Sequence, residues 1–294
     1  MRQYIIIVFC FCIIASGTLA APFSPYNGYN TAVQALNPMA SWQLNETSGT
    51  TAYDSTGSIH GTYVNSPTLN QPGPSLAGMP NDKAVLFNGS QDHVDIPAAN
   101  FAFKNQSLSI SSWVYITDND NIYRSFISLG DGTSSSSTWI NLAKARSGWN
   151  SGRIYFEIYN GTSSSLANSN LDGNNLPKNE WMHLTGVVDK ANNIVKLYIN
   201  GTLQLTSTLV NFDLTTVSQI QLHLGTFCFP YAQEHNSYLD EVAIYNYALS
   251  ETQVGYLYGA AFNSAVPEPA TFILLGIFLS LMFCKKIVLV KMIL

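Results

Sequence analysis

Asp240 is the acidic residue whose position most clearly predicts chemistry. It lies in the apolar segment 238–246, where the two-residue period of a strand places it on the same face as Val242 and Ile244. If that is the core face, the carboxylate is costly unless a partner or a metal ion neutralises it. Calcium is the metal that carboxylate and carbonyl oxygens would hold there. The alternative is a hydrogen-bonded aspartate at the start of a strand.

Aromatic side chains in loop-like segments form a second group of candidates. Sugar rings stack on the flat faces of tryptophan and tyrosine, and acidic or amide groups bond the sugar hydroxyls. Trp149 lies in the Ser- and Gly-rich segment 147–152, and Trp139 and Tyr231 also lie near loops. If exposed, these three residues predict a carbohydrate-binding surface. If folded beneath a sheet edge, they only pack.

No arrangement of residues typical of a hydrolase is present. The sequence contains neither Gly-x-Ser-x-Gly nor His-Glu-x-x-His, and its five histidines are scattered. Glu157 has no second carboxylate near it in the sequence with which to share acid and base roles. We therefore expect no enzymatic activity.

Composition excludes several further classes of protein. Charged residues make up only 11% of the 294 residues and aromatic residues 12%, so the chain can bury a core and is not disordered. The acidic balance and the lack of a Lys/Arg cluster in the middle argue against a nucleic-acid partner. Without the two terminal segments described below, nine basic residues remain against 18 acidic ones, giving a net charge of about −9.

Residues 1–20 have the pattern of a secretory signal peptide. Arg2 precedes an apolar run that is too short to span a membrane, and small residues lead to a predicted cleavage site after Ala20. Cys10 and Cys12 would leave with this segment. Cys228 is then the only cysteine of the exported domain, and we expect it to be a small buried hydrophobic residue.

The C-terminal segment 270–294 predicts a membrane helix. Its uncharged part, 270–284, would span about 22 Å, and Lys285 and Lys286 would reach the cytoplasmic interface. Together with Pro267, Glu268 and Pro269, this order resembles the PEP-CTERM sorting signal of exported proteins in Gram-negative bacteria that make extracellular polysaccharide. The resemblance implies processing by an exosortase-type enzyme at the inner membrane. The added apolar tail at 287–294 departs from the pattern, and an ordinary tail anchor is the alternative.

Between these ends the sequence predicts an all-β domain. Short segments rich in Val, Ile, Tyr, Phe and Thr are separated by turn residues, and Asn200-Gly201 joins the clearest hairpin. Two stacked antiparallel sheets are the architecture that such strands favour. The predicted strands are 41–45, 61–65, 84–89, 93–97, 108–117, 124–129, 137–144, 153–159, 181–189, 194–200, 202–207, 219–226 and 237–246.

One helix is predicted near the end of this domain. Ser250 as N-cap and Gln253 as its partner form a capping box, and the helix should end near Gly259. The serine run at 163–165 predicts an exposed loop. The domain boundaries follow as a signal peptide at 1–20, a lead-in at 21–37, the β domain at 38–260, a linker at 261–269 and the membrane tail at 270–294.

An ordered set of fragments resembles the bacterial laminin-G-like domain of the concanavalin A-like lectin/glucanase superfamily. The resemblance implies an antiparallel two-sheet jelly-roll sandwich over residues 38–260. The fragments are 42–49, 53–57, 84–90, 92–94, 108–114, 181–184, 197–201, 239–246 and 248–250.

The resemblance also bears on the sites. Glucanases of the superfamily carry Glu-x-Asp-x-x-Glu on one strand, and this motif is missing here. Related jelly rolls hold a structural calcium ion between an early Glu and a late Asp, which implies Glu46 and Asp240, with Asp54 or Asp92. In the same way, Trp42, Trp113 and Trp181 fall at core positions of the family.

The expected function is therefore non-catalytic. We expect an exported domain, anchored in the inner membrane until it is sorted to the cell surface or matrix, that binds extracellular polysaccharide. A structural or adhesive protein that binds another surface protein is the alternative, and a glycan-active enzyme is a third.

Overall fold

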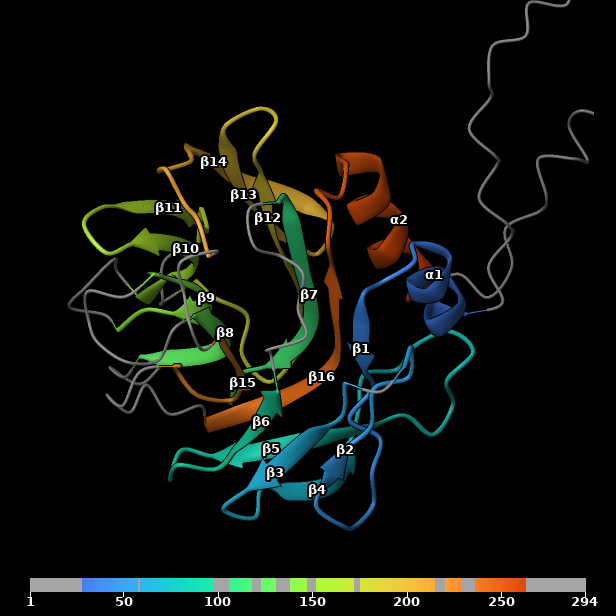
Figure 1. Cartoon of the computed structure of the whole chain (residues 1–294). Coiled ribbons are helices and arrows are strands. Elements are labelled where there is room, and N and C mark those ends of the chain that lie inside the picture. Colours follow the sequence, from blue (N-terminus) through green and yellow to red (C-terminus); the bar gives the residue numbers. More distant parts are fainter. Residues whose placement is uncertain are drawn as a thin grey trace, which may run out of the picture. The chain divides into compact units, whose positions relative to one another are not determined.

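The chain folds into a two-layered β-sandwich with two short helices on one side (Figure 1). The computed structural model describes residues 28–57, 59–97, 106–117, 123–130, 138–146, 152–171, 175–214, 220–228 and 236–262. The segments predicted to be a signal peptide and a sorting tail, with Pro267, Glu268, Pro269, Lys285 and Lys286, lie outside these residues. No helix in the described part is long and apolar enough to cross a membrane.

Two antiparallel sheets make up the sandwich, which confirms the predicted all-β class. Sheet A runs in the order β14 (Thr202–Thr208), β13 (Ile194–Ile199), β12 (Trp181–Asp189), β7 (Leu108–Tyr115), β16 (Asn236–Tyr245), β5 (Lys83–Asn88) and β4 (Thr68–Pro72), with β1 (Ala40–Trp42) also paired to β16. Sheet B runs in the order β11 (Ser164–Asn168), β10 (Ile154–Asn160), β9 (Thr138–Lys144), β8 (Arg124–Gly130), β15 (Gln221–Leu224), β6 (His93–Pro97), β3 (Gly61–Val64) and β2 (Thr51–Ala52).

The predicted strands are all present, and three further strands were missed. β2 is only a two-residue strand, and β4 has no apolar alternation for a sequence pattern to detect. The third, β11, shows that the serine run 163–165 is not simply an exposed loop. Ser165 is buried opposite Ile158, and its hydroxyl accepts a hydrogen bond from the Val210 N–H at 2.6 Å.

The inner faces of the two sheets form the main core. Alternate residues of each strand point inward, including Trp42, Phe87, Val114, Phe126 and Phe156, all fully buried. Asn200 and Gly201 adopt the left-handed conformation that a tight hairpin turn requires between β13 and β14. Trp42 therefore has the packing role predicted for it.

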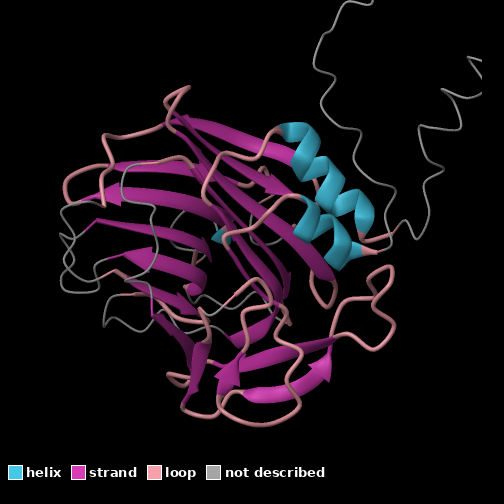
Figure 2. Cartoon of the chain, turned by 45° about the vertical axis from the view of Figure 1, so that its right-hand side comes forward, coloured by secondary structure: helices cyan, strands magenta, loops and turns pink. Residues whose placement is uncertain are grey.

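Helices α1 (Tyr29–Ala35) and α2 (Glu251–Ala260) cover part of the outer face of sheet A (Figure 2). The predicted capping box of α2 is confirmed, because the Gln253 N–H donates to the Ser250 hydroxyl and the Ser250 N–H donates to the Gln253 side chain. Helix α1 lies within the predicted lead-in segment 21–37. It was missed because it is short and its apolar residues gain their order by packing against Trp113 and α2.

Candidate functional site

The outer face of sheet B carries a row of polar and aromatic side chains. Because β8, β9, β10 and β15 are in register, residues at equivalent positions line up across the sheet. Four polar residues form one row across four neighbouring strands. Their order is Glu157 (β10), Asn141 (β9), Ser128 (β8) and His223 (β15), and each lies opposite the next. None of these four side chains belongs to the main core.

Aromatic rings form one end of this face. Trp139 and Tyr159 are cross-strand neighbours whose rings stack at a centroid distance of 5.1 Å and an angle of 30°. The Phe227 ring meets Trp139 edge-on, also at 5.1 Å. All three are only partly buried. Gly130 lies opposite Trp139, and a Cβ there would approach the Trp139 Cβ to 2.6 Å, so only glycine leaves room for the indole.

Hydrogen bonds hold the polar part of the face in place. The Ser125 hydroxyl donates to the Asn141 side-chain oxygen at 2.6 Å, and the Asn141 amide donates to the Tyr155 hydroxyl at 3.2 Å. The Ser128 hydroxyl donates to the Thr226 carbonyl at 2.9 Å. These amide and hydroxyl groups are buried and already hydrogen-bonded, so they fix the sheet beside the aromatic rings.

Two ionisable groups in the described part of this face have shifted pKa values. Burial raises the pKa of Glu157, and a hydrogen bond with Ser164 opposes the shift. The direct cross-strand neighbours of Glu157 are Asn141 and Leu166, neither of which is a carboxylate. At the other end of the row, burial lowers the pKa of His223, which lies 3.5 Å from Asp95.

The predicted ligand-binding residues have different outcomes. Trp139 lies on this outer face, beside Tyr159, which the sequence analysis did not single out. The two-residue period of 155–159, with Tyr155, Glu157 and Tyr159 on one face, was the signal that could have found it. Trp149 and Tyr231 lie outside the described residues.

Three of the predicted calcium ligands are engaged in separate local structures. Asp54 accepts hydrogen bonds from the Ser41, Thr56 and Ile59 N–H groups. Glu46 accepts from the Tyr53 N–H and from the Tyr63 hydroxyl.

The third of these carboxylates, Asp92, accepts from the Asn88 N–H, and its other oxygen is buried without a hydrogen bond. Within the described ranges, no three His, Cys, Asp or Glu side chains are grouped as around a metal ion. The predicted set of four carboxylates is therefore not assembled as one site.

Asp240 does not share a face with Val242 and Ile244, so that prediction was wrong. A β-bulge in β16 between Asp240 and Ala243 interrupts the two-residue period. Glu241, inside the bulge, has a positive φ of 48°. Val242 and Ile244 face the main core, whereas Asp240 lies opposite Trp113, a residue of the cluster under the helices.

Asp240, Glu241 and Asp82 form a buried acidic group on this side of sheet A. Asp240 and Glu241 are almost completely buried. Asp240 and Asp82 interact with each other, and hydrogen bonds from Asn45 and from the N–H groups of Lys83 and Glu241 partly oppose the effect of burial on their pKa values. Burial is the largest cause that raises the pKa of Asp240 and Glu241 well above the ordinary range, and nearby Asp82 adds to it. Burial also raises the pKa of Asp82 to about 6.

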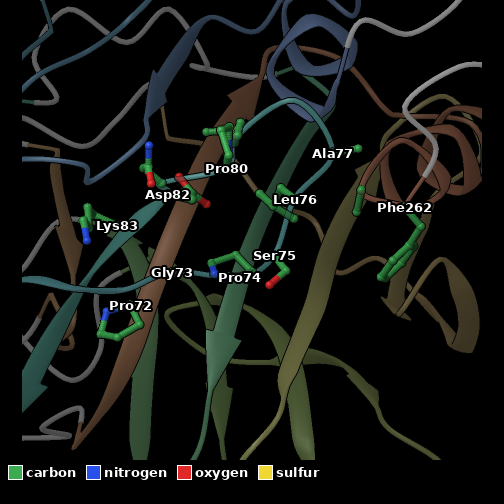
Figure 3. A pocket seen from close by; sticks show the side chains of 13 residues that line it. Pro72, Gly73, Pro74, Ser75, Leu76, Ala77, Pro80, Asp82, Lys83 and Phe262 are labelled. Atoms are coloured by element: carbon green, nitrogen blue, oxygen red, sulfur yellow. The ribbon is translucent and has the colours of Figure 1, made fainter.

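The segment from Pro72 to Lys83 lies over this acidic group. Gly73 donates its N–H to the Asp82 carbonyl at 3.1 Å, and a Cβ on Gly73 would lie 3.0 Å from Asp240 Oδ2. The same segment curves round a cavity of about 560 Å³, which Phe262 also lines (Figure 3). No sequence pattern marked Asp82, because it lies in an irregular segment between strands.

The comparisons with known proteins agree with this architecture. Residues 88–255, more than half of the chain, match the family model described as the concanavalin A-like lectin/glucanases superfamily. None of the curated proteins matches the chain in sequence.

Solved structures with a similar fold belong to proteins with different activities. Domain 4 of an extracellular arabinanase from Geobacillus stearothermophilus, solved with arabinotriose, is 24% identical with a TM-score of 0.56, over 75% of this chain and 98% of that one. The receptor binding domain of botulinum neurotoxin D is 16% identical (TM-score 0.57, 76% of this chain and 52% of that one).

A third structure of similar fold is the Trypanosoma rangeli sialidase in complex with sialic acid. It is 13% identical, with a TM-score of 0.55, over 74% of this chain and 32% of that one. These likenesses support the fold, and the family model covers most of the sandwich. The chain belongs to the concanavalin A-like lectin/glucanases superfamily.

Proposed function

We propose that this protein is an exported, non-catalytic binding domain that recognises carbohydrate at the outer face of sheet B. The observation that carries the proposal is the partly exposed Trp139–Tyr159 stack, with Glu157 two residues before Tyr159 on the same face of β10. A sugar ring needs both elements, since its C–H face packs on an aromatic ring and its hydroxyls need oriented hydrogen-bond partners.

The same face supports binding more than catalysis. Glycoside hydrolysis uses two carboxylates about 5–9 Å apart. Glu157 has an amide and a leucine as its cross-strand neighbours, and the Glu-x-Asp-x-x-Glu motif is missing from the sequence. A binding domain is therefore the simpler proposal, and hydrolysis of a bound glycan in the assay below would favour the enzyme alternative.

Two further points favour a neutral saccharide. The arabinanase domain of similar fold was solved with a bound trisaccharide, which makes this class of ligand a reasonable first choice. The acidic net charge of this chain repels anionic polymers.

We also propose, from the terminal segments, that the protein is exported from a Gram-negative cell and sorted by an exosortase-type enzyme. The inner membrane would hold it through residues 270–294 until it reaches the cell surface or the matrix.

A glycan-array screen of residues 21–265 tests the binding proposal. We expect neutral oligosaccharides to bind the parent domain, and Trp139→Ala to lose that binding while retaining the parent's circular-dichroism spectrum. Tyr53→Ala is the matched control, because Tyr53 is an aromatic residue that is 59% exposed and lies away from sheet B's aromatic end. Equal binding by parent and Trp139→Ala would overturn the site, and no glycan binding would favour a protein partner.

We propose in addition that a calcium ion stabilises the fold at Asp82 and Asp240. The family resemblance implies an ion held by Glu46 and Asp240, and the structure places a second buried carboxyl group, that of Asp82, beside Asp240. Glu241 lies next to them. Glu46, Asp54 and Asp92 are better explained by the hydrogen bonds that they accept.

A further inference from the structure

A second surface with the chemistry of a saccharide site lies on the opposite side of the sandwich. Tyr115 on β7, Trp181 on β12 and Tyr238 on β16 are direct cross-strand neighbours in sheet A. They alternate with the core residues Val114, Met182 and Leu239, so their side chains point to the outer face.

These three rings form one aromatic group, here called the sheet A aromatic trio. The ring centroids of Tyr115 and Trp181 are 5.5 Å apart, those of Tyr115 and Tyr238 5.3 Å, and those of Trp181 and Tyr238 6.3 Å. All three side chains are only partly buried. Trp181 was expected to be a core residue, and its partial exposure beside two tyrosines corrects that expectation.

The helices leave the sheet A aromatic trio partly exposed, although Trp181 packs against the cluster beneath them. Trp113, two residues before Tyr115 on β7, is buried by Tyr29 and Tyr258 from the two helices. At the trio the adjoining segment is instead Pro72–Gly73, which lines a cavity of about 170 Å³ together with the three rings. That volume equals roughly five or six water molecules, at about 30 Å³ each, which suits one small ring.

A larger and more polar cavity adjoins this one. The cavity of about 560 Å³ in Figure 3 is also lined by Pro72 and Gly73, so the same two residues border both cavities. Its lining adds the polar side chains of Ser75, Asn81 and Lys83. Asp82 also lines this cavity, and a neutral ligand would meet no charge repulsion from its carboxylate.

We propose that the two adjoining cavities form a second binding groove for a neutral oligosaccharide. One sugar residue would pack on the sheet A aromatic trio, and the next would bond the polar groups of the larger cavity. The indole N–H of Trp181 and the hydroxyls of Tyr115 and Tyr238 add hydrogen-bonding groups to the aromatic surface. An apolar partner would leave these groups unused.

The position of the groove gives the domain two binding faces. The Trp139 face belongs to the outer side of sheet B and the trio to the outer side of sheet A, so one domain could hold two polysaccharide chains at once. This inference takes its ligand class from the proposed function, but it rests on different residues. The two can therefore fail separately.

Calorimetric titration with neutral trisaccharides (arabinotriose, xylotriose and maltotriose) tests the groove. For at least one of them we expect two sites per parent domain and one site in each of Trp181→Ala and Trp139→Ala. Trp181→Phe keeps an aromatic surface and should retain two sites, and Tyr53→Ala should behave as the parent. Each variant is first checked for a parent-like melting temperature, and Tyr238→Ala replaces Trp181→Ala if the latter does not fold.

The outcomes separate the two claims. One site in the parent, lost in Trp139→Ala and unchanged in Trp181→Ala, would overturn the second groove and leave the proposed function intact. No binding of any trisaccharide would overturn both. In another outcome, a polyproline peptide binds the parent but not Trp181→Ala, while Trp181→Ala binds the trisaccharides as the parent does. That result would assign the groove to a protein partner and overturn the saccharide proposal.

Discussion

Asp240 lies beside Asp82 beneath Gly73, and the two carboxyl groups interact directly. The bulge in β16 produces this arrangement, because it turns Asp240 away from the main core and toward the segment 72–83. Glu241 adds a third buried carboxyl group. A group of this kind is either protonated or neutralised by a cation.

The pH dependence of the metal-free domain follows from these raised pKa values. A carboxyl group whose folded-state pKa is raised stabilises the fold below its ordinary pKa, and that contribution is lost as the pH rises through the folded value. For Asp82 the window runs from 3.8 to about 6. In the presence of a chelator, we therefore expect the melting temperature to fall as the pH rises from about 4 to about 6. Asp240 and Glu241 extend the fall to higher pH.

Calcium should reverse this loss. At pH 7.5, calcium at about 100 times its dissociation constant adds about 2.7 kcal/mol, which raises the melting temperature by roughly 5–10 °C. Asp240→Asn should melt higher than the parent in chelator at this pH, because it removes a buried charge, and it should no longer respond to calcium.

Glu46→Gln is the matched control for the calcium experiment. Glu46 bonds the Tyr53 N–H and the Tyr63 hydroxyl and is not one of the two carboxylates proposed to hold the ion, so this variant should keep the full calcium response. Identical melting of the parent in chelator and in calcium would contradict a stabilising ion. Loss of the response in Glu46→Gln would instead favour the ligand set implied by the family resemblance.

Gly73→Ala should destabilise the domain. The added Cβ would lie 2.9 Å from the Asp82 carbonyl carbon and 3.0 Å from Asp240 Oδ2, so the segment 72–83 must shift. Overpacking of this kind costs about 1–3 kcal/mol, and we expect thermal unfolding to begin roughly 3–10 °C lower.

The same substitution at Gly255 should instead stabilise the domain. Gly255 is exposed in α2, and nothing lies within 4 Å of its added Cβ. Alanine is favoured over glycine in a helix by about 1 kcal/mol, so Gly255→Ala should raise the melting temperature by a few degrees. Equal effects at the two positions would show that Gly73 is not packed as described.

The capping box of α2 should contribute measurably to stability. Ser250→Ala removes the acceptor of the Gln253 N–H, at a cost of about 1 kcal/mol and a melting temperature about 2–4 °C lower. Thr252→Ala, at an exposed position of the same helix, should change it by less than half as much. If Ser250→Ala left the melting temperature unchanged, tertiary packing alone would hold the helix.

Most of the strands could be predicted because their signals are local. The alternation in 194–199 and the Asn200-Gly201 turn fix one hairpin without reference to the rest of the chain. The strand β11 and the helix α1 depend on distant partners, such as the Val210 N–H for Ser165 and α2 for Tyr29. Their own sequences therefore carried too little information.

The site was harder to predict for the same reason. A two-residue period predicted Asp240 to face the core, and it failed because a single extra residue in a bulge reverses the faces on either side. Asp82 is remote from Asp240 in the sequence, so only the pairing of β5 with β16 brings the two together. Trp139 was identified by residue type alone, whereas its neighbour Tyr159 depends on strand register.

Affinity electrophoresis through gels that contain neutral polysaccharides tests the central claim most directly. With a polysaccharide whose oligosaccharides bind on the array, we expect the parent domain and Tyr53→Ala to be retarded equally. Trp139→Ala should bind at least tenfold more weakly, which corresponds to about 1.4 kcal/mol. Trp139→Phe, which keeps a smaller ring against Tyr159, should fall between them. Equal retardation of parent and Trp139→Ala in every gel would contradict a carbohydrate site on the outer face of sheet B.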